Sequence, residues 1–290
     1  MTTKTVIPIP PSYYSDESIN LDDTSKYLNY LSSSGIETVM TTAGTSQFNL
    51  LTTDEVHLLN KTVCEEYDKN KIIGIPPLSS IETEKFIRVA DDYVDSKTKF
   101  IIMYPERHYD NNTIRQYFNR IKRHTYLDIY VHTMGLRSGT GGYWEYESDL
   151  IRNLFYDGLI VGIKEEYANI QQAFDFVSML PENLDVVVAG GSMRRHNFLK
   201  LAGANSLLGG IGNLFPKIEL NYCETEDECS LILEKKLFDV FMRFGWHRAL
   251  RIGISYLGLG CDYDRMPWPV RDIECKEIIA KCIEDIKSEK

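Results

Sequence analysis

Residues 158–164 have the sequence GLIVGIK, and residues 184–190 have the sequence LDVVVAG. Both runs are short and almost entirely apolar, without the polar and apolar alternation of a half-exposed antiparallel strand. Strands of this kind are buried on both faces, as in a parallel sheet that is covered by helices. The two runs therefore predict strands of a parallel sheet in an α/β protein.

Similar β-branched runs recur along the chain, and amphipathic segments with apolar residues at helical spacing separate them. The predicted strands are Thr5–Ile9, Ile36–Thr41, Lys71–Ile75, Lys99–Met103, Leu127–Val131, Leu159–Ile163, Asp185–Ala189 and Ser206–Ile211. The helices predicted between them are Asp22–Ser34, Thr53–Asn70, Thr83–Ser96, Asn111–Arg123, Glu145–Phe155, Ile170–Met179 and Arg194–Leu201. Eight β-α units in strict order favour a closed (β/α)8 barrel, the TIM barrel, over an open doubly wound sheet.

The pattern after the eighth predicted strand is wholly helical. Three helices are expected, at Glu226–Phe244, His247–Leu257 and Arg271–Ser288, and the prolines of the segment 265–270 separate the last two. We therefore predict a barrel in residues 1–220, which carries the active site, and a three-helix extension in residues 221–290 that packs on it.

Charge and composition exclude several classes of protein. The 290-residue chain has 32 Lys and Arg residues against 42 Asp and Glu residues, a net charge of −10, so it offers no basic field to nucleic acid or to an anionic membrane. No apolar run approaches the roughly 20 residues that cross a bilayer, and the N-terminal segment does not resemble a signal peptide. A cytoplasmic protein is expected, and its six cysteines, without a CxxC pair, predict reduced thiols.

Lys164 ends the apolar run 158–164, and in a TIM barrel the catalytic groups lie at the C-terminal ends of the strands. A lysine in that position loses hydration, which favours the neutral amine that can attack a carbonyl carbon. The alternative, equally weighted from position alone, is a structural lysine that pairs with Glu165 or Glu166.

Two loops are candidates for binding a substrate. Residues 41–48, TTAGTSQF, follow the second predicted strand, and the small residues Gly44 and Thr45 could offer backbone N–H groups and a hydroxyl to a carboxylate. Taken by itself, this segment is more often a turn that caps the next helix. The glycine-rich segment 203–216 would let the backbone of Leu208 or Gly209 approach a ligand closely.

Tyr130 lies near the end of the fifth predicted strand. A phenol near a desolvated lysine can move a proton to and from a developing alkoxide, although most of the eighteen tyrosines must be core or surface residues. His132 faces the same side of that strand and could also line the mouth of the barrel, but a single histidine is more often structural.

These segments match the motifs of a known family in order. The match consists of Gly44-Thr-Ser-Gln-Phe-Asn-Leu-Leu-Thr-Thr-Asp-Glu for G-T-x-G-E…L-T-x-x-E, Tyr130 for the tyrosine of Y-N-x-P, Gly162-Ile-Lys164-Glu for G-x-K-[ED], Ala189-Gly-Gly-Ser for its S/A-G-x-D turn, Gly203…Asn213…Pro216 for G-x-x-G-x-I-S…N…P, and Arg265-Met-Pro-Trp-Pro for R-x-P-L-x-P. From about Val6 to Val270, the chain resembles the dihydrodipicolinate synthase / N-acetylneuraminate lyase family of pyruvate-dependent class I aldolases and dehydratases.

The resemblance implies a Schiff base between Lys164 and the keto carbon of pyruvate or a related 2-oxo acid. It further implies that Gly44 and Thr45 hold the substrate carboxylate and that Tyr130 transfers protons. No cofactor is expected, and no set of His, Asp and Glu residues at the strand ends suggests a metal site. By analogy, the protein would be a homodimer or a homotetramer.

The chain departs from the family pattern in ways that leave its reaction open. Gly44 replaces the first of two threonines in the synthases, which speaks against dihydrodipicolinate synthase itself and favours the dehydratases of the family. Either Tyr104 or Tyr109 could serve as a second tyrosine, and Arg137 could bind substrate. We expect a Schiff-base lyase of the class I aldolase type with an aldehyde or sugar-acid partner. The alternatives are a keto-deoxy-sugar-acid dehydratase and an inactive relative with a binding or regulatory role.

Overall fold

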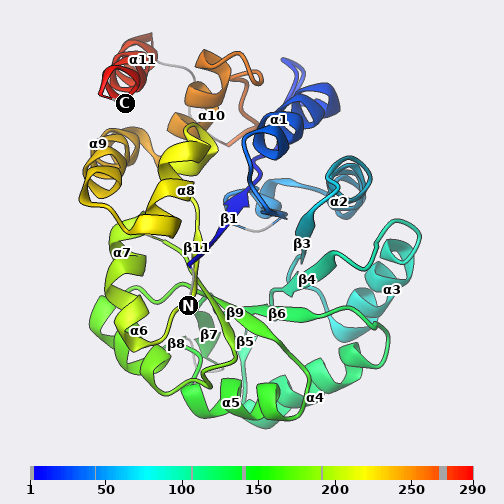
Figure 1. The fold of residues 1–290 in the computed structure, drawn as a ribbon. Helices are drawn as coiled ribbons and strands as arrows, with labels where there is room; N and C mark the ends of the chain where they lie inside the picture. Colours follow the sequence, from blue (N-terminus) through cyan, green and yellow to red (C-terminus); the bar gives the residue numbers. More distant parts are fainter. Residues whose placement is uncertain are drawn as a thin grey trace.

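The computed structural model describes residues 3–42, 44–105, 107–138, 142–190, 192–267 and 273–289. Its centre is a closed barrel of parallel strands inside a ring of helices (Figure 1). The strands follow one another around the barrel in the order β1-β11-β10-β9-β6-β4-β3-β2, and β1 also pairs with β2, which closes the barrel. The TIM-barrel fold predicted from the sequence is confirmed.

Each of the eight barrel strands overlaps one predicted strand. Their bounds are β1 (Lys4–Pro8), β2 (Thr38–Thr41), β3 (Asn70–Ile75), β4 (Thr98–Ile102), β6 (Ile129–His132), β9 (Gly162–Glu165), β10 (Asp185–Val188) and β11 (Ser206–Leu208). Strands β6 and β9 begin and end later than predicted. In front of β9 the cause is local, because Gly158 has φ +70° and the N–H of Leu159 bonds the carbonyl of Leu154, so these residues close the preceding helix.

Seven helices alternate with the strands as predicted. They are α1 (Leu21–Ser33), α2 (Thr53–Glu66), α3 (Ser80–Ala90), α4 (Asn111–Lys122), α5 (Ser148–Tyr156), α6 (Ile170–Ser178) and α7 (Ser192–Leu199). Helix α2 begins with a capping box, in which Thr52 and Glu55 each bond the other's backbone N–H. This cap starts the helix directly after the loop that carries Gly44 and Thr45.

The sequence prediction missed an eighth helix and a small second sheet. Helix α8 (Pro216–Thr225) follows β11, and its proline stands at the first helical turn, where the missing N–H costs nothing. Helix α8 spans residue 220, where we predicted that the barrel ends and the C-terminal extension begins. This division of the chain into two parts stays a prediction. Strands β5 (Arg107–His108), β7 (Leu136–Ser138) and β8 (Tyr143–Trp144) are too short for a periodic pattern to reveal.

Three further helices complete the described chain: α9 (Glu228–Phe244), α10 (Trp246–Tyr256) and α11 (Ile273–Ser288). Residues 271–272, where the last helix was predicted to begin, lie outside the described residues, as do residues 268–270 of the proline segment. Buried side chains of the three helices share one apolar cluster with Ile7 of β1 and Leu207 of β11. In Figure 1 these helices lie beside α8 and α1, at one side of the barrel.

All six cysteines are free thiols, as predicted, and four of them are buried. Among the residues described, no three or more His, Cys, Asp or Glu side chains are grouped so that they could hold a metal ion. No helix in the described ranges has both the length and the apolar character that a membrane span requires.

Candidate active site

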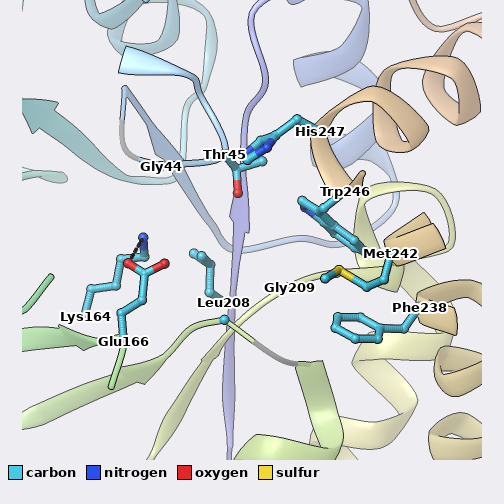
Figure 2. A pocket seen from close by; sticks show the side chains of 12 residues that line it. Gly44, Thr45, Lys164, Glu166, Leu208, Gly209, Phe238, Met242, Trp246 and His247 are labelled. Atoms are coloured by element: carbon cyan, nitrogen blue, oxygen red, sulfur yellow. Dashed lines mark hydrogen bonds and ion pairs between the residues drawn. The ribbon is translucent and has the colours of Figure 1, made fainter. Parts of the chain in front are cut away.

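A cavity of about 270 Å³ opens at the C-terminal ends of the barrel strands. One part of its lining follows the strands: Gly44, Thr45, Lys164, Glu166, Gly190, Leu208, Gly209 and Gly210. The other part comes from the C-terminal helices: Phe238, Met242, Trp246 and His247. Figure 2 shows Lys164 and Glu166 on one side, the α9 and α10 side chains on the other, and Leu208 with Gly209 between them. Five of the six predicted site residues therefore share one cavity.

Lys164 lies on the inner face of β9 and is only 1% exposed. Its Nζ atom is 2.9 Å from Nε2 of His132 and 3.3 Å from Oε2 of Glu166. The N–H and hydroxyl of Thr133 both bond the Lys164 carbonyl, at 3.1 and 2.8 Å, and so fix the backbone of the lysine. The amine is thus held at the end of the cavity by two groups that can exchange protons with it.

The two partners of Lys164 differ in charge. Burial lowers the pKa of His132, the nearby Lys164 lowers it further, and these effects outweigh the contact with Glu166, so the imidazole is neutral at pH 7. Burial opposes ionisation of Glu166, but Lys164 and His132 overcome this effect and hold the pKa of its carboxyl well below its usual value. Glu166 keeps 35% of its side chain exposed and therefore reaches the cavity as a carboxylate.

Glu165, the last residue of β9, points away from the cavity and anchors the strand. Its buried carboxylate pairs with Arg195 of α7 at 2.6 Å and accepts the N–H of Tyr167 at 2.8 Å. Arg195 also bonds the carbonyl of Tyr167 at 2.7 Å. These bonds hold the segment on both sides of Glu166, so the two glutamates predicted as partners of Lys164 have different roles, and only Glu166 contacts it.

The loop after β2 brings Gly44 and Thr45 to the lysine. A Cβ atom on Gly44 would lie 3.5 Å from Nζ of Lys164, so the backbone passes directly beside the amine. Ser46 ties the loop to β1 through a 2.6 Å hydrogen bond to the carbonyl of Ile9, and the backbone of Gly44 bonds His247 of α10. Figure 2 shows the hydroxyl of Thr45 directed into the cavity. Ala43 lies outside the described residues.

The glycines after β11 are required by close packing. Buried Glu219 of α8 accepts the N–H groups of Gly210 at 3.2 Å and Gly212 at 2.7 Å. A side chain on Gly209 would collide with this carboxylate and with Ile7. The predicted glycine-rich segment thus lets the backbone of Leu208 and Gly209 border the cavity, as expected.

The prediction that Tyr130 lies at the mouth of the barrel beside Lys164 is wrong. Tyr130 opposes Gly162 on β9, at the opposite end from the mouth, and its hydroxyl donates to Oδ2 of Asp185 at 2.6 Å. It lines a separate cavity of about 170 Å³ among residues that begin the strands, such as Lys4 and Ser206. Burial, assisted by Asp185, raises the pKa of its phenol, so the hydroxyl stays protonated.

The residue that faces Lys164 across β6 and β9 is His132. Side chains two residues apart on a strand share a face, so Tyr130 and His132 both point inward, but the later one is closer to the C-terminal end. The strand had been predicted to end at Val131, which left His132 beyond it. A rule that favours the last inward residue of the strand would have selected the histidine.

The other residues left open by the sequence do not line this cavity in the described part of the chain. Tyr104 is buried against Tyr117 with their rings edge to face, and Tyr109 is 68% exposed. Arg137 lies on β7 of the small sheet. Neither tyrosine therefore faces the amine of Lys164 in this structure.

Replacing Tyr130 with phenylalanine separates the roles of the two inward residues on β6. The variant loses a hydrogen bond to Asp185, so we expect its free energy of unfolding to fall by about 1–2 kcal/mol. Any reaction of Lys164 with a 2-oxo acid should keep its rate, because the phenol lies at the other end of the barrel. Urea unfolding and adduct kinetics measure the two effects. A large loss of rate in the folded variant would restore the sequence-based role of Tyr130.

Known proteins resemble this chain in sequence and in fold. No family model matches the chain. A curated protein, 4-hydroxy-tetrahydrodipicolinate synthase 2 of Clostridium acetobutylicum, is 25% identical over 210 residues, which cover 72% of this chain and 69% of that protein.

Solved structures share the fold over nearly the whole length. YagE of E. coli K12, a dihydrodipicolinic acid synthase family protein in complex with pyruvate, has a TM-score of 0.84 at 13% identity and covers 99% of each chain. Dihydrodipicolinate synthase of Thermotoga maritima has a TM-score of 0.82 at 16% identity, again with 99% of each chain. The chain is thus similar in sequence to one curated synthase over most of its length and shares the fold of solved dihydrodipicolinate synthase family structures over nearly all of it.

Proposed function

We propose that this protein is a lyase of the class I aldolase type, in which Lys164 forms a Schiff base with pyruvate or a related 2-oxo acid. The observation that carries the proposal is the buried amine of Lys164 at the end of a strand-end cavity, within 2.9 Å of His132 and 3.3 Å of Glu166. The pyruvate bound to YagE supports the same substrate class.

Formation of the imine requires two proton transfers. The neutral amine of Lys164 attacks the keto carbon, a C–N bond forms, and the carbonyl oxygen takes up a proton. The oxygen then leaves as water after a second protonation, and the nitrogen, which has given up one proton, keeps the other and forms a double bond to carbon as a protonated imine. Loss of a proton from the neighbouring carbon gives an enamine, which is the carbon nucleophile.

His132 and Glu166 are the groups we assign to these transfers. Nε2 of His132 contacts both the lysine amine and the Glu166 carboxylate, so it can accept a proton from one and pass it to the other. The imidazole takes the place that the resemblance had given to the phenol of Tyr130. Glu166 is also exposed to the cavity and can reach the substrate oxygen.

The substrate carboxylate must be held by local groups, because the net charge of −10 repels an anion at long range. We assign this role to the hydroxyl of Thr45 and to the backbone beside Gly44, which passes next to Lys164. In this arrangement the carboxylate and the keto carbon of one small molecule are bound by adjacent residues.

Reduction with borohydride in the presence of pyruvate tests the proposal. Borohydride converts an imine to a stable secondary amine, so mass spectrometry of the intact protein should show one added pyruvate, and peptide mapping should place it on Lys164. Protein reduced without a 2-oxo acid is the control. Absence of an adduct with pyruvate and with longer 2-oxo acids would contradict the enzymatic function and favour a binding or regulatory role.

A further inference from the structure

The cavity has a polar end and an apolar end. Its polar end holds Lys164, Glu166 and Thr45, and burial together with Arg251 lowers the pKa of His247, which is therefore neutral at pH 7. Lys164 and Glu166 are the charged residues among the described lining, and their opposite charges pair with each other. After Lys164 has formed an imine, the described lining offers no second cation to a further carboxylate.

The apolar end consists of Phe238, Met242 and Trp246, which we call the apolar wall. Phe238 and Met242 are four residues apart and share one face of α9, and Trp246 is the first residue of α10. The core-facing stripe of α9 is a different one, formed by buried residues that include Leu237 and Phe241. Phe238 and Met242 therefore lie outside the core stripe of α9, whereas Trp246 also packs against Phe241.

The wall is packed into a defined position although it is partly exposed. The rings of Phe238 and Trp246 have centroids 5.9 Å apart, and Trp246 lies so close to the β11 loop that a Cβ on Gly210 would be 3.2 Å from its ring. The Arg194 guanidinium lies 5.4 Å from the Phe238 ring and pairs with Glu234. Met242 remains 53% exposed. Exposed apolar surface beside a reactive amine favours contact with apolar groups of a substrate.

From this arrangement we infer that the carbon partner of the reaction is an aldehyde with an uncharged apolar substituent, either aromatic or branched aliphatic. The inference rests on the proposed function. A polyhydroxylated chain would leave its hydroxyls without hydrogen-bond partners against Phe238, Met242, Trp246 and Leu208, and a second carboxylate would lack a cation.

The residues of this site can carry out each bond change of the aldol cleavage. In the cleavage direction, Lys164 forms an imine with a 4-hydroxy-2-oxo acid and releases water. Glu166 or His132 accepts the proton of the 4-hydroxyl, the C3–C4 bond breaks, and its electron pair forms the enamine while the aldehyde leaves. Protonation at C3 and addition of water then release pyruvate and the free lysine. The substituent on C4 lies against the apolar wall throughout.

Condensation of pyruvate with two aldehydes of opposite character tests the inference. Benzaldehyde and glyceraldehyde are the probes, and the product with a new carbon–carbon bond is measured by mass spectrometry. We expect kcat/KM to be at least about tenfold higher for benzaldehyde, which is the scale of discrimination that an apolar pocket provides. If the protein forms the pyruvate adduct but prefers glyceraldehyde, the inference is wrong and the proposed function still holds. If no pyruvate adduct forms, the proposed function itself is contradicted.

Two exposed apolar residues of α9 give a matched pair of variants. Met242→Ser changes the wall, and Ile232→Ser changes a residue of equal exposure, 51%, that does not line the cavity. We expect Met242→Ser to reduce the benzaldehyde to glyceraldehyde ratio of kcat/KM by about tenfold, and Ile232→Ser to leave it unchanged. If Met242→Ser instead changes the mass in light scattering but not this ratio, the wall contacts a second copy of the chain, and the inference is wrong.

Discussion

Replacing Lys164 with arginine is expected to abolish the borohydride-trapped adduct with pyruvate while the protein stays folded. A guanidinium keeps its positive charge and can pair with Glu166, but it does not lose a proton at accessible pH and so cannot attack a carbonyl. The loss of turnover should therefore be complete within detection. Intact-mass spectrometry after reduction measures it, and circular dichroism checks the fold.

The chain contains a matched control for this substitution. Lys71 is also fully buried, and it bonds Asp95 at 2.7 Å and the carbonyl of Tyr67 at 3.0 Å, close to the opposite end of the barrel. Lys71→Arg should keep the full adduct, because burial beside a carboxylate alone does not make a lysine a nucleophile. An adduct that persists in Lys164→Arg would show that another amine reacts.

Replacing His132 with glutamine is expected to slow formation of the imine by about 10²–10⁴-fold, the usual contribution of a positioned acid or base. Glutamine can hydrogen-bond Lys164 and Glu166 but cannot carry a proton between them. Stopped-flow or quench measurements of adduct formation give the rate. His196, which is buried on α7 and bonds the hydroxyl of Tyr222 at 3.0 Å, supplies the control variant His196→Gln, which should keep the wild-type rate.

The dependence of the imine-formation rate on pH is a second test of the role of His132. Only neutral His132 can accept a proton, and burial lowers its pKa, so the neutral form persists below the usual histidine value of about 6.5. Charging of the imidazole should therefore lower the wild-type rate only below about pH 6.5. In His132→Gln this acid limb should disappear. An acid limb that is unchanged in the variant would assign the titration to another group.

The predicted site residues that line the cavity differ from Tyr130 in the kind of information that placing them required. Lys164 was selected because it ends an apolar strand of a predicted barrel and matches the G-x-K-[ED] motif, although position alone gave a structural lysine equal weight. Gly44, Thr45, Leu208 and Gly209 were found because they follow strands directly, and the loops that follow the strands of a barrel meet at one end. Tyr130 was misplaced because a strand period of two defines the inward face but not the height along the barrel axis.

The residues of the apolar wall could not have been selected from the sequence. Phe238 and Met242 have the ordinary spacing of a helix core, and nothing local distinguishes their stripe from that of Leu237 and Phe241. Which stripe faces the cavity depends on how α9 packs against α7 and α8, and on the contact between Trp246 and the loop after β11. These contacts join residues that lie far apart along the chain.

The sequence by itself determined the class of the fold, the order of its eight strands and the lysine at a strand end, because hydrophobic periodicity and apolar runs are local properties. The tertiary structure alone decided which group faces that lysine and what borders the other end of its cavity. His132 opposes Lys164 through the register of β6 against β9, and α9 and α10 supply the apolar wall. Register and helix packing arise from contacts distant in sequence, so no local pattern encodes them.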